Sequence, residues 1–174
     1  MSSIDPWIRV YSGKQFHFLN PKQSEIDIYD IAHNLSQLCR FTGSTRTFYS
    51  IAEHCCRVSD ILPDSLKLSG LAHDFAEAYM ADINSPLKSI LPQYKEVERR
   101  VEAVIYKKYN IKYPFPAEVK NADMVLLVTE MRDLMPKEDF KTIPFKPLDK
   151  PVKPWSMKRA ETELLKRFFA YLNI

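Results

Sequence analysis

The sequence predicts an all-α protein, and two observations support this. Hydrophobic residues make up 45% of the 174-residue chain, whereas glycine occurs 3 times. This composition suits packed helices better than a loop-rich or all-β fold. From residue 27 onward, apolar residues recur at intervals of three and four, which is the repeat of an amphipathic helix. A chain of this length fits one domain with a single core, so we expect residues 1–174 to form one compact domain.

The first segment, residues 1 to about 26, shows the weakest helical pattern. It contains Pro6, Gly13 and Pro21, and apolar residues alternate locally in WIRVY and KQFHFL. Proline and glycine mark turns, and a period of two is typical of strands. We expect a short hairpin or a short extended N-terminal arm here, with His17 as part of it.

The first helix starts where the three-and-four repeat begins. Asp27 or Asp30 can cap it, and the repeat ends near Arg40. Residues 41–49 contain Gly43 and several Ser and Thr residues, which favours a loop.

The second and third helices contain the most unusual residues of the chain. The segment 50–53 has the capping-box form S-x-x-E, which places His54 in the first turns of the second helix. Pro63-Asp64 ends that helix and can cap a third, whose apolar positions run from 66 to 76. The doublet His73-Asp74 is therefore expected in the C-terminal half of the third helix.

The rest of the chain is again mainly helical, and Asp123 interrupts an otherwise apolar helix face there. The expected elements are a loop with a short helical turn over 79–92, an amphipathic helix over 93–109, a helix over 116–135, an extended proline-rich stretch over 144–154 and a last helix over 156–171.

Charge and cysteine content exclude several classes of protein. The net charge of +3 is small and the basic residues form no run, so we expect no binding to duplex nucleic acid. No apolar stretch is long enough to span a bilayer, and the N-terminus lacks the apolar region of a signal peptide, so we expect a cytoplasmic protein that does not enter membranes. Cys39, Cys55 and Cys56 are interpreted as reduced, packed thiols.

Four residues from three predicted helices share an anomaly, because each lies on or beside an apolar stripe. They are His54, His73, Asp74 and Asp123. Buried imidazole and carboxylate groups are costly unless something positive lies between them. Two nitrogen and two oxygen ligands suit a catalytic ion of the Zn, Mn, Co, Ni or Fe type that keeps open positions for water. The alternative is a helical protein in which these residues make core hydrogen bonds.

Two further acids follow the doublet. Glu77 lies three residues after Asp74 and would share its face of a helix, and Asp82 follows in the loop. A metal neutralises phosphate oxygens and lowers the pKa of bound water, and nearby acids can move protons, which together suit phosphoester or phosphoanhydride hydrolysis. The alternative makes Glu77 a solvated helix acid and Asp82 a cap.

The ordered set of Glu53-His54, His73-Asp74, Glu77, Asp82 and Asp123 resembles the HD-domain metal-dependent phosphohydrolases. The motif AHDFAEAYMADINSPLK looks closest to the small 5′-deoxynucleotidase branch and to phage-encoded dATP triphosphohydrolases. The likeness covers nearly the whole chain, from DIAHNLS and CRFTG to ADMVLLVTEMRDLMP and the Pro154-Trp155 pair.

This resemblance implies a helical HD fold and a role for each matching residue. His54, His73, Asp74 and Asp123 would hold one divalent transition metal (Co, Mn, Zn or Ni), and Glu77, assisted by Asp82, would position the attacking water. In the deoxynucleotidase branch an Arg followed by an aromatic residue reads sugar and base, and Arg40-Phe41 stands at that place, with Phe where Trp is expected. The resemblance further implies a homo-oligomer.

Three more residues are predicted to contact the substrate. Arg46 and Lys88 are positive residues in segments that flank the expected site, and they could clamp phosphates. Pro86 precedes Lys88 in the same motif and is placed with them. Ordinary exposed positions are the alternative for Arg46 and Lys88.

The sequence therefore favours a hydrolase that attacks the α-phosphorus of a deoxynucleotide with a metal-activated water. The leading hypothesis is a dNTP triphosphohydrolase of the dATP type, which releases deoxynucleoside and triphosphate; an additional Mg²⁺ could accompany that substrate. One alternative is a 5′-deoxynucleotidase that acts on dNMPs. A second alternative, from another class, is a non-catalytic HD module that binds nucleotides.

Overall fold

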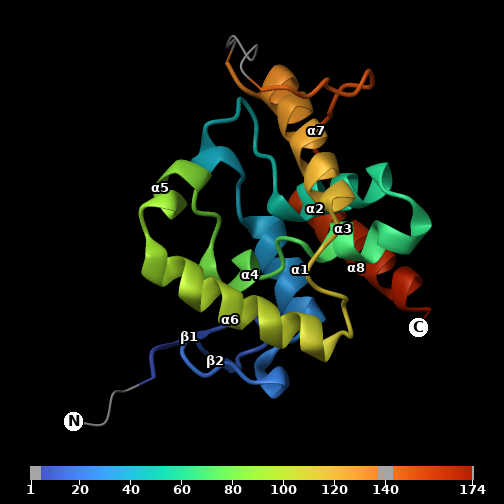
Figure 1. Cartoon of the computed structure of the whole chain (residues 1–174). Helices are drawn as coiled ribbons and strands as arrows, with labels where there is room; N and C mark the ends of the chain where they lie inside the picture. The colour runs from blue at the N-terminus through green and yellow to red at the C-terminus, as the bar shows by residue number, and fades with distance from the viewer. Residues whose placement is uncertain (1–4, 137–142, 174) are drawn as a thin grey trace.

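The protein is all-α, as the sequence predicts, in a computed structural model that describes residues 5–136 and 143–173 (Figure 1). The termini of the predicted domain 1–174 thus lie outside the described residues. The helices are α1 Ile28–Gln37, α2 Ile51–Ile61, α3 Lys67–Ala72, α4 Glu77–Met80, α5 Ser85–Ser89, α6 Pro92–Lys108, α7 Ala117–Leu134 and α8 Met157–Leu172.

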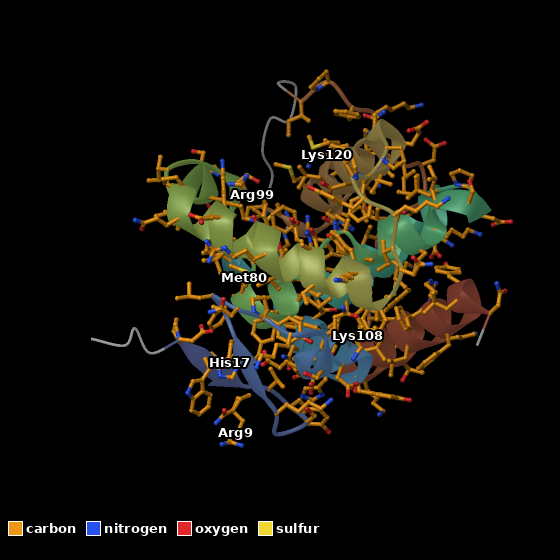
Figure 2. The ribbon with its side chains drawn as sticks, turned by 60° about the horizontal axis from the view of Figure 1, so that its bottom comes forward. Arg9, His17, Met80, Arg99, Lys108 and Lys120 are labelled. Atoms are coloured by element: carbon orange, nitrogen blue, oxygen red, sulfur yellow. The ribbon has the colours of Figure 1, made fainter. Side chains whose placement is uncertain are left out.

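The N-terminal segment forms the hairpin that was one of its two expected structures. Strands β1 (Trp7–Arg9) and β2 (Gln15–His17) pair antiparallel. Gly13 lies between them with a φ of +85°, a conformation that glycine adopts without steric cost. His17 belongs to the hairpin and its Nδ1 lies 3.0 Å from Glu25. Figure 2 shows Arg9 and His17 at one edge of the molecule.

Two predicted helix caps are confirmed. The Asp27 side chain accepts a hydrogen bond from the backbone of Tyr29, and the Ser50 side chain accepts one from the backbone of Glu53. The Glu53 carboxylate does not complete a capping box at α2, since it binds Arg57 and the backbone N–H of Trp155. Helix α1 ends at Gln37, three residues before the predicted end.

The third predicted helix is not continuous. Helix α3 ends at Ala72, and residues 73–76 form a tight turn before α4 begins at Glu77. The backbone bonds across this turn span three residues, as in a 3₁₀ helix, and include Glu77 N–H to the Asp74 carbonyl. The Gly70 carbonyl accepts a bond from Nδ1 of His73, so an imidazole replaces the amide of a regular helix there. His73 and Asp74 therefore lie just beyond the end of α3.

Helix α2 is the centre of the molecule. It packs against α1, α3, α7 and α8, and most of its residues are buried. The larger core cluster lies between α1, α2 and α8, and a smaller one joins α2 to α7 through Val58 and Leu126. This arrangement brings the first turn of α2, the end of α3 and the middle of α7 together. None of the helices in the described part of the chain combines the length and apolar character that a bilayer span requires.

Candidate metal centre

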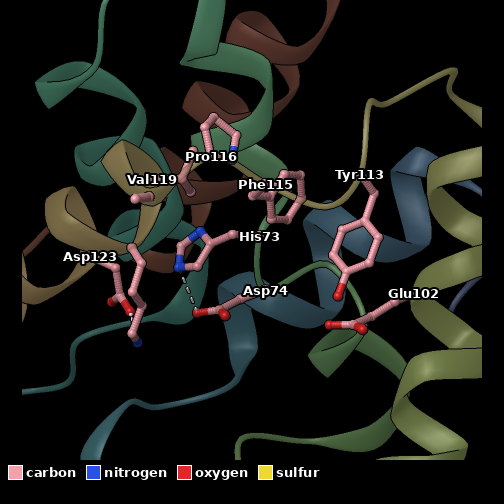
Figure 3. Close-up of a pocket in the computed structure, with 10 residues that line it drawn as sticks. His73, Asp74, Glu102, Tyr113, Phe115, Pro116, Val119 and Asp123 are labelled. Atoms are coloured by element: carbon pink, nitrogen blue, oxygen red, sulfur yellow. Dashed lines mark hydrogen bonds and ion pairs between the residues drawn. The ribbon is translucent and has the colours of Figure 1, made fainter.

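The four residues singled out by the sequence converge in space. Nε2 of His54 lies 3.3 Å from Nε2 of His73, 3.3 Å from Oδ1 of Asp123 and 3.7 Å from Oδ2 of Asp74. Nε2 of His73 lies 3.2 Å from Oδ2 of Asp74, as the dashed line in Figure 3 marks. The quartet joins α2, the turn after α3, and α7.

Both imidazoles present the same nitrogen to the centre. Nδ1 of His54 lies 2.7 Å from Oε1 of Glu130, and Nδ1 of His73 lies 2.8 Å from the Gly70 carbonyl. An oxygen acceptor without a proton obliges each Nδ1 to carry a hydrogen, so in the neutral imidazoles Nε2 is the nitrogen left to bind a metal.

The donor set fits a transition metal. Ligands at about 2.0–2.2 Å from a tetrahedral ion lie roughly 3.3 Å from one another, and this is the spacing seen around His54. The ligand atoms of His54, His73 and Asp123 all lie within 4.8 Å of one another, and so do those of Cys55, His73 and Asp74.

Cys55 is the weaker candidate of the two groups. Burial and the charge of Asp74 raise the pKa of the Cys55 thiol well above its usual range, and only a thiolate binds a metal strongly. Two nitrogens and two carboxylates therefore remain the set best suited to the ion.

The electrostatics of the quartet favour a cation at its centre. Burial raises the pKa of Asp74 and Asp123, but the neighbouring histidines outweigh burial and lower it, so both acids are ionised. Burial and Arg40 oppose protonation of His54, yet Glu130 and Asp123 raise its pKa to about 9. The protein thus places positive charge between its carboxylates, and a divalent ion would supply the same charge.

The pKa values of the two acids that follow the doublet shift in the opposite direction. Burial, with the charges of Asp74 and Asp82, raises the pKa of Glu77 well above its usual range. Burial and Asp74 also raise the pKa of Asp82. Oε2 of Glu77 is buried and has no hydrogen-bond partner among the described residues. An unpartnered carboxyl oxygen beside the quartet is available to a water molecule or a substrate.

Arg40, predicted as a substrate contact, lies beside the quartet. Its Nε lies 3.2 Å from Oε2 of Glu130, and NH1 lies 3.6 Å from Oδ2 of Asp74. Its guanidinium carbon lies 5.4 Å from the centre of the Phe41 ring. Phe41 and Thr42 have positive φ values of 55° and 52°, which non-glycine residues adopt at a cost, as they do at many functional sites.

The other predicted substrate contacts divide into two groups. Nζ of Lys88 lies 2.7 Å from Glu98 and 3.9 Å from Glu77, so this lysine reaches the edge of the site. Arg46 and Pro86 are exposed, and within the described residues no contact links either side chain to the quartet.

A recess of about 270 Å³ opens onto His73, Asp74 and Asp123 (Figure 3). Its volume is close to the lower end of about 300–1,000 Å³ that is typical of small-molecule sites. The other lining residues were not singled out by the sequence: Glu102, Tyr113, Phe115, Pro116, Ala117, Val119 and Lys120. Nζ of Lys120 lies 2.7 Å from Oδ2 of Asp123, so a cation also stands at the recess.

Among the described residues, His33, Cys39 and Cys56 belong to neither group of possible metal ligands. His33 stacks on Tyr11 with ring centres 3.6 Å apart and lies 3.7 Å from Glu161. Cys39 and Cys56 are free thiols, as expected of reduced cysteines.

The fold and the site define an all-α protein with a buried His–Asp cluster that could hold a metal ion. The chain belongs to the family of the uncharacterized protein YfdR of Escherichia coli (strain K12), with 42% identity over 128 residues, which span 74% of this chain and 72% of YfdR. It is also 30% identical over 126 residues to an uncharacterized protein of Rhodobacter capsulatus, spanning 67% of this chain and 64% of that protein. No model of a protein family matches the chain. Neither relative's name states an activity, so the functional argument rests on the site.

Proposed function

We propose that this chain is an HD-type phosphohydrolase that attacks the α-phosphorus of deoxynucleotides and depends on one divalent transition metal. The observation that carries the proposal is the convergence of two Nε2 atoms and two aspartates at spacings of 3.2–3.7 Å beside the unpartnered carboxyl oxygen of Glu77. Buried polar groups are normally hydrogen-bonded, so an unpartnered carboxyl oxygen beside four possible ligands favours a site that binds a further group.

His54, His73, Asp74 and Asp123 would hold the metal. When bound, a divalent ion neutralises phosphate oxygens and lowers the pKa of water. The identity of the ion stays open between Co, Mn, Zn and Ni, since sites of this ligand type accept several first-row metals.

Glu77 supplies proton transfer in this proposal. Burial makes the ionised Glu77 carboxylate a stronger base than an exposed one, so in that form it can accept a proton from an attacking water and later return it to the leaving oxygen. Asp82 lies five residues later in the loop after α4 and assists by keeping the pKa of Glu77 high, because its charge disfavours a second charge nearby.

Arg40 and Lys88 are the cations that bind phosphate. The Arg40 side chain is 11% exposed and its guanidinium is held by Glu130, so it presents a fixed positive charge beside Asp74. Nζ of Lys88 lies 3.9 Å from Oε1 of Glu77. Phe41, under the Arg40 guanidinium, is placed to contact sugar or base. Arg46 and Pro86 stay predicted contacts without support from the geometry.

The leading substrate is a dNTP of the dATP type, since the resemblance of the 72–88 motif is closest to phage-type triphosphohydrolases. A dNMP is the alternative because the attack on phosphorus is the same in both reactions. A binding module without catalysis is less consistent with the site, since it would need neither Glu77 nor Asp82. A homo-oligomer stays a prediction that size-exclusion chromatography with light scattering can test.

The test is a product screen. Purified protein is incubated with Co²⁺, Mn²⁺, Zn²⁺ or Mg²⁺ and each dNTP, NTP and dNMP, and products are separated by anion-exchange chromatography. Intact triphosphate from dATP would establish the leading hypothesis, and orthophosphate from dNMPs alone would establish the 5′-deoxynucleotidase. The variant Asp74→Ala should be inactive, whereas Asp64→Ala, at a fully exposed acid, should match wild type. Absence of hydrolysis with every substrate would contradict the proposal.

A further inference from the structure

The carboxylate of Glu130 is fully buried, yet it makes three hydrogen bonds to side chains from separate parts of the chain. Oε1 accepts from Nδ1 of His54 at 2.7 Å and from the Tyr49 hydroxyl at 2.8 Å. Oε2 accepts from Nε of Arg40 at 3.2 Å. One carboxylate thus contacts both a candidate metal ligand and the candidate phosphate-binding arginine.

These bonds fix the direction in which two functional groups point. With its Nδ1 proton donated to Glu130, His54 can turn only Nε2 towards the quartet, and the ring cannot rotate without breaking a short bond. Arg40 donates through Nε, which leaves its two terminal nitrogens to face Asp74 and a ligand. Tyr49 is fully buried as well and limits movement of the carboxylate.

We infer that Glu130 is a positioning residue that sets the metal affinity of the centre through His54 and the substrate affinity through Arg40. The second half of this inference rests on the proposed function, and the first half requires only that the quartet binds a metal.

Glu53 provides a matched control for a merely structural role. Like Glu130, it has 0% exposure, and it also binds an arginine and a further donor. Its partners are Arg57 and the Trp155 backbone, neither of which belongs to the quartet. Loss of either buried carboxylate should lower thermal stability, but only Glu130 should affect the metal.

The experiment is an equilibrium titration with Co²⁺ followed by visible absorption, in wild type, Glu130→Gln and Glu53→Gln. An amide in place of the Glu130 carboxylate cannot accept from all three donors. The dissociation constant for Co²⁺ should rise about 10–100-fold in Glu130→Gln, the usual range for loss of a partner of a ligating histidine, and stay at the wild-type value in Glu53→Gln. Equal affinities in wild type and Glu130→Gln, or equal losses in both variants, would overturn the inference.

A second measurement needs no variant and therefore does not depend on the folding of Glu130→Gln. Nitrogen-15 NMR of the wild-type protein loaded with Zn²⁺ reports which nitrogen of His54 carries the proton. We expect the proton on Nδ1, and a proton on Nε2 would overturn the inference.

The two proposals fail in different ways. Tight Co²⁺ binding without hydrolysis of any nucleotide would remove the proposed function and leave the metal-positioning role of Glu130 intact. If the protein hydrolyses a nucleotide but Glu130→Gln binds Co²⁺ as tightly as wild type, only the proposed role of Glu130 is refuted. If hydrolysis is observed, Glu130→Gln should also raise KM, because Arg40 loses its fixed direction.

Discussion

The carboxyl groups around the quartet divide into two kinds. Neighbouring histidines hold the pKa of Asp74 and Asp123 low, whereas burial beside those charges raises the pKa of Glu77. Permanently ionised groups suit metal binding, and a group that can gain and lose a proton suits acid–base catalysis. The environments of the side chains, and not their types, therefore assign the roles.

Replacement of Glu77 by Gln tests this division at the residue scale. An amide keeps the shape of the side chain but cannot accept a proton, so turnover should fall about 10²–10⁴-fold while Co²⁺ binding is retained. Steady-state kinetics and the Co²⁺ titration check the two parts. Glu118→Gln, at an exposed glutamate in the first turn of α7, is the control. A near-normal rate in Glu77→Gln would move the proton-transfer role to another group.

The quartet could be predicted from the sequence because His54, His73, Asp74 and Asp123 each break an apolar pattern. Glu130 could not be assigned a role in the same way. It lies on the same side of α7 as Asp123, but its partners Tyr49 and Arg40 are 81 and 90 residues away, and a sequence pattern does not show such contacts. The recess residues Glu102 and Tyr113 were missed for the same reason.

At the scale of elements, the position of the doublet depends on how α3 ends against α2. The caps of α1 and α2 were predictable, since Asp27 and Ser50 cap them through their own side chains. The start of the last helix was predictable too, and Ser156 caps α8 there in the same way. The break in the third helix after Ala72 was not predictable, because the apolar repeat continues through it. The bond from His73 to the Gly70 carbonyl that accompanies the break is a property of the folded site.

Gly70 is the contact point between these two helices. A Cβ atom built there would lie 2.4 Å from Cδ1 of Leu62 and 3.2 Å from the backbone of Ser59. Alanine normally favours a helix over glycine, but here its Cβ would displace the Leu62 side chain and crowd the backbone of Ser59. We expect Gly70→Ala to lower the free energy of unfolding by about 1–3 kcal/mol, the usual cost of overpacking.

Urea unfolding of the apoprotein measures this loss. Ser65→Ala is the control, since it changes an exposed residue just before α3. Its free energy of unfolding should stay within about 0.5 kcal/mol of the wild-type value. A Gly70→Ala protein as stable as wild type, or more stable, would show that the two helices are not in close contact.

At the scale of the molecule, the quartet joins α2, the turn after α3, and α7, so a bound ion would link the two core clusters. The all-α class was predictable from composition and periodicity, whereas the packing of these three elements around one point was not. That convergence depends on α2 lying at the centre, which no local pattern specifies.

Metal binding should therefore stabilise the whole fold. At Co²⁺ about 100 times its dissociation constant, the free energy of unfolding should increase by about 2.7 kcal/mol. For a chain of this size that corresponds to a rise in Tm of roughly 5–10 °C, measurable by differential scanning calorimetry. Asp74→Ala should show no such rise, and an equal rise in the variant would place the stabilising metal elsewhere.

The measurement that tests the central claim most directly is hydrolysis of dATP by chelator-treated protein before and after one equivalent of Co²⁺ is added. We predict no turnover before addition and release of deoxyadenosine with intact triphosphate after it. Hydrolysis that is equal with and without metal, or no hydrolysis of dATP or dAMP at any metal concentration, would contradict the account.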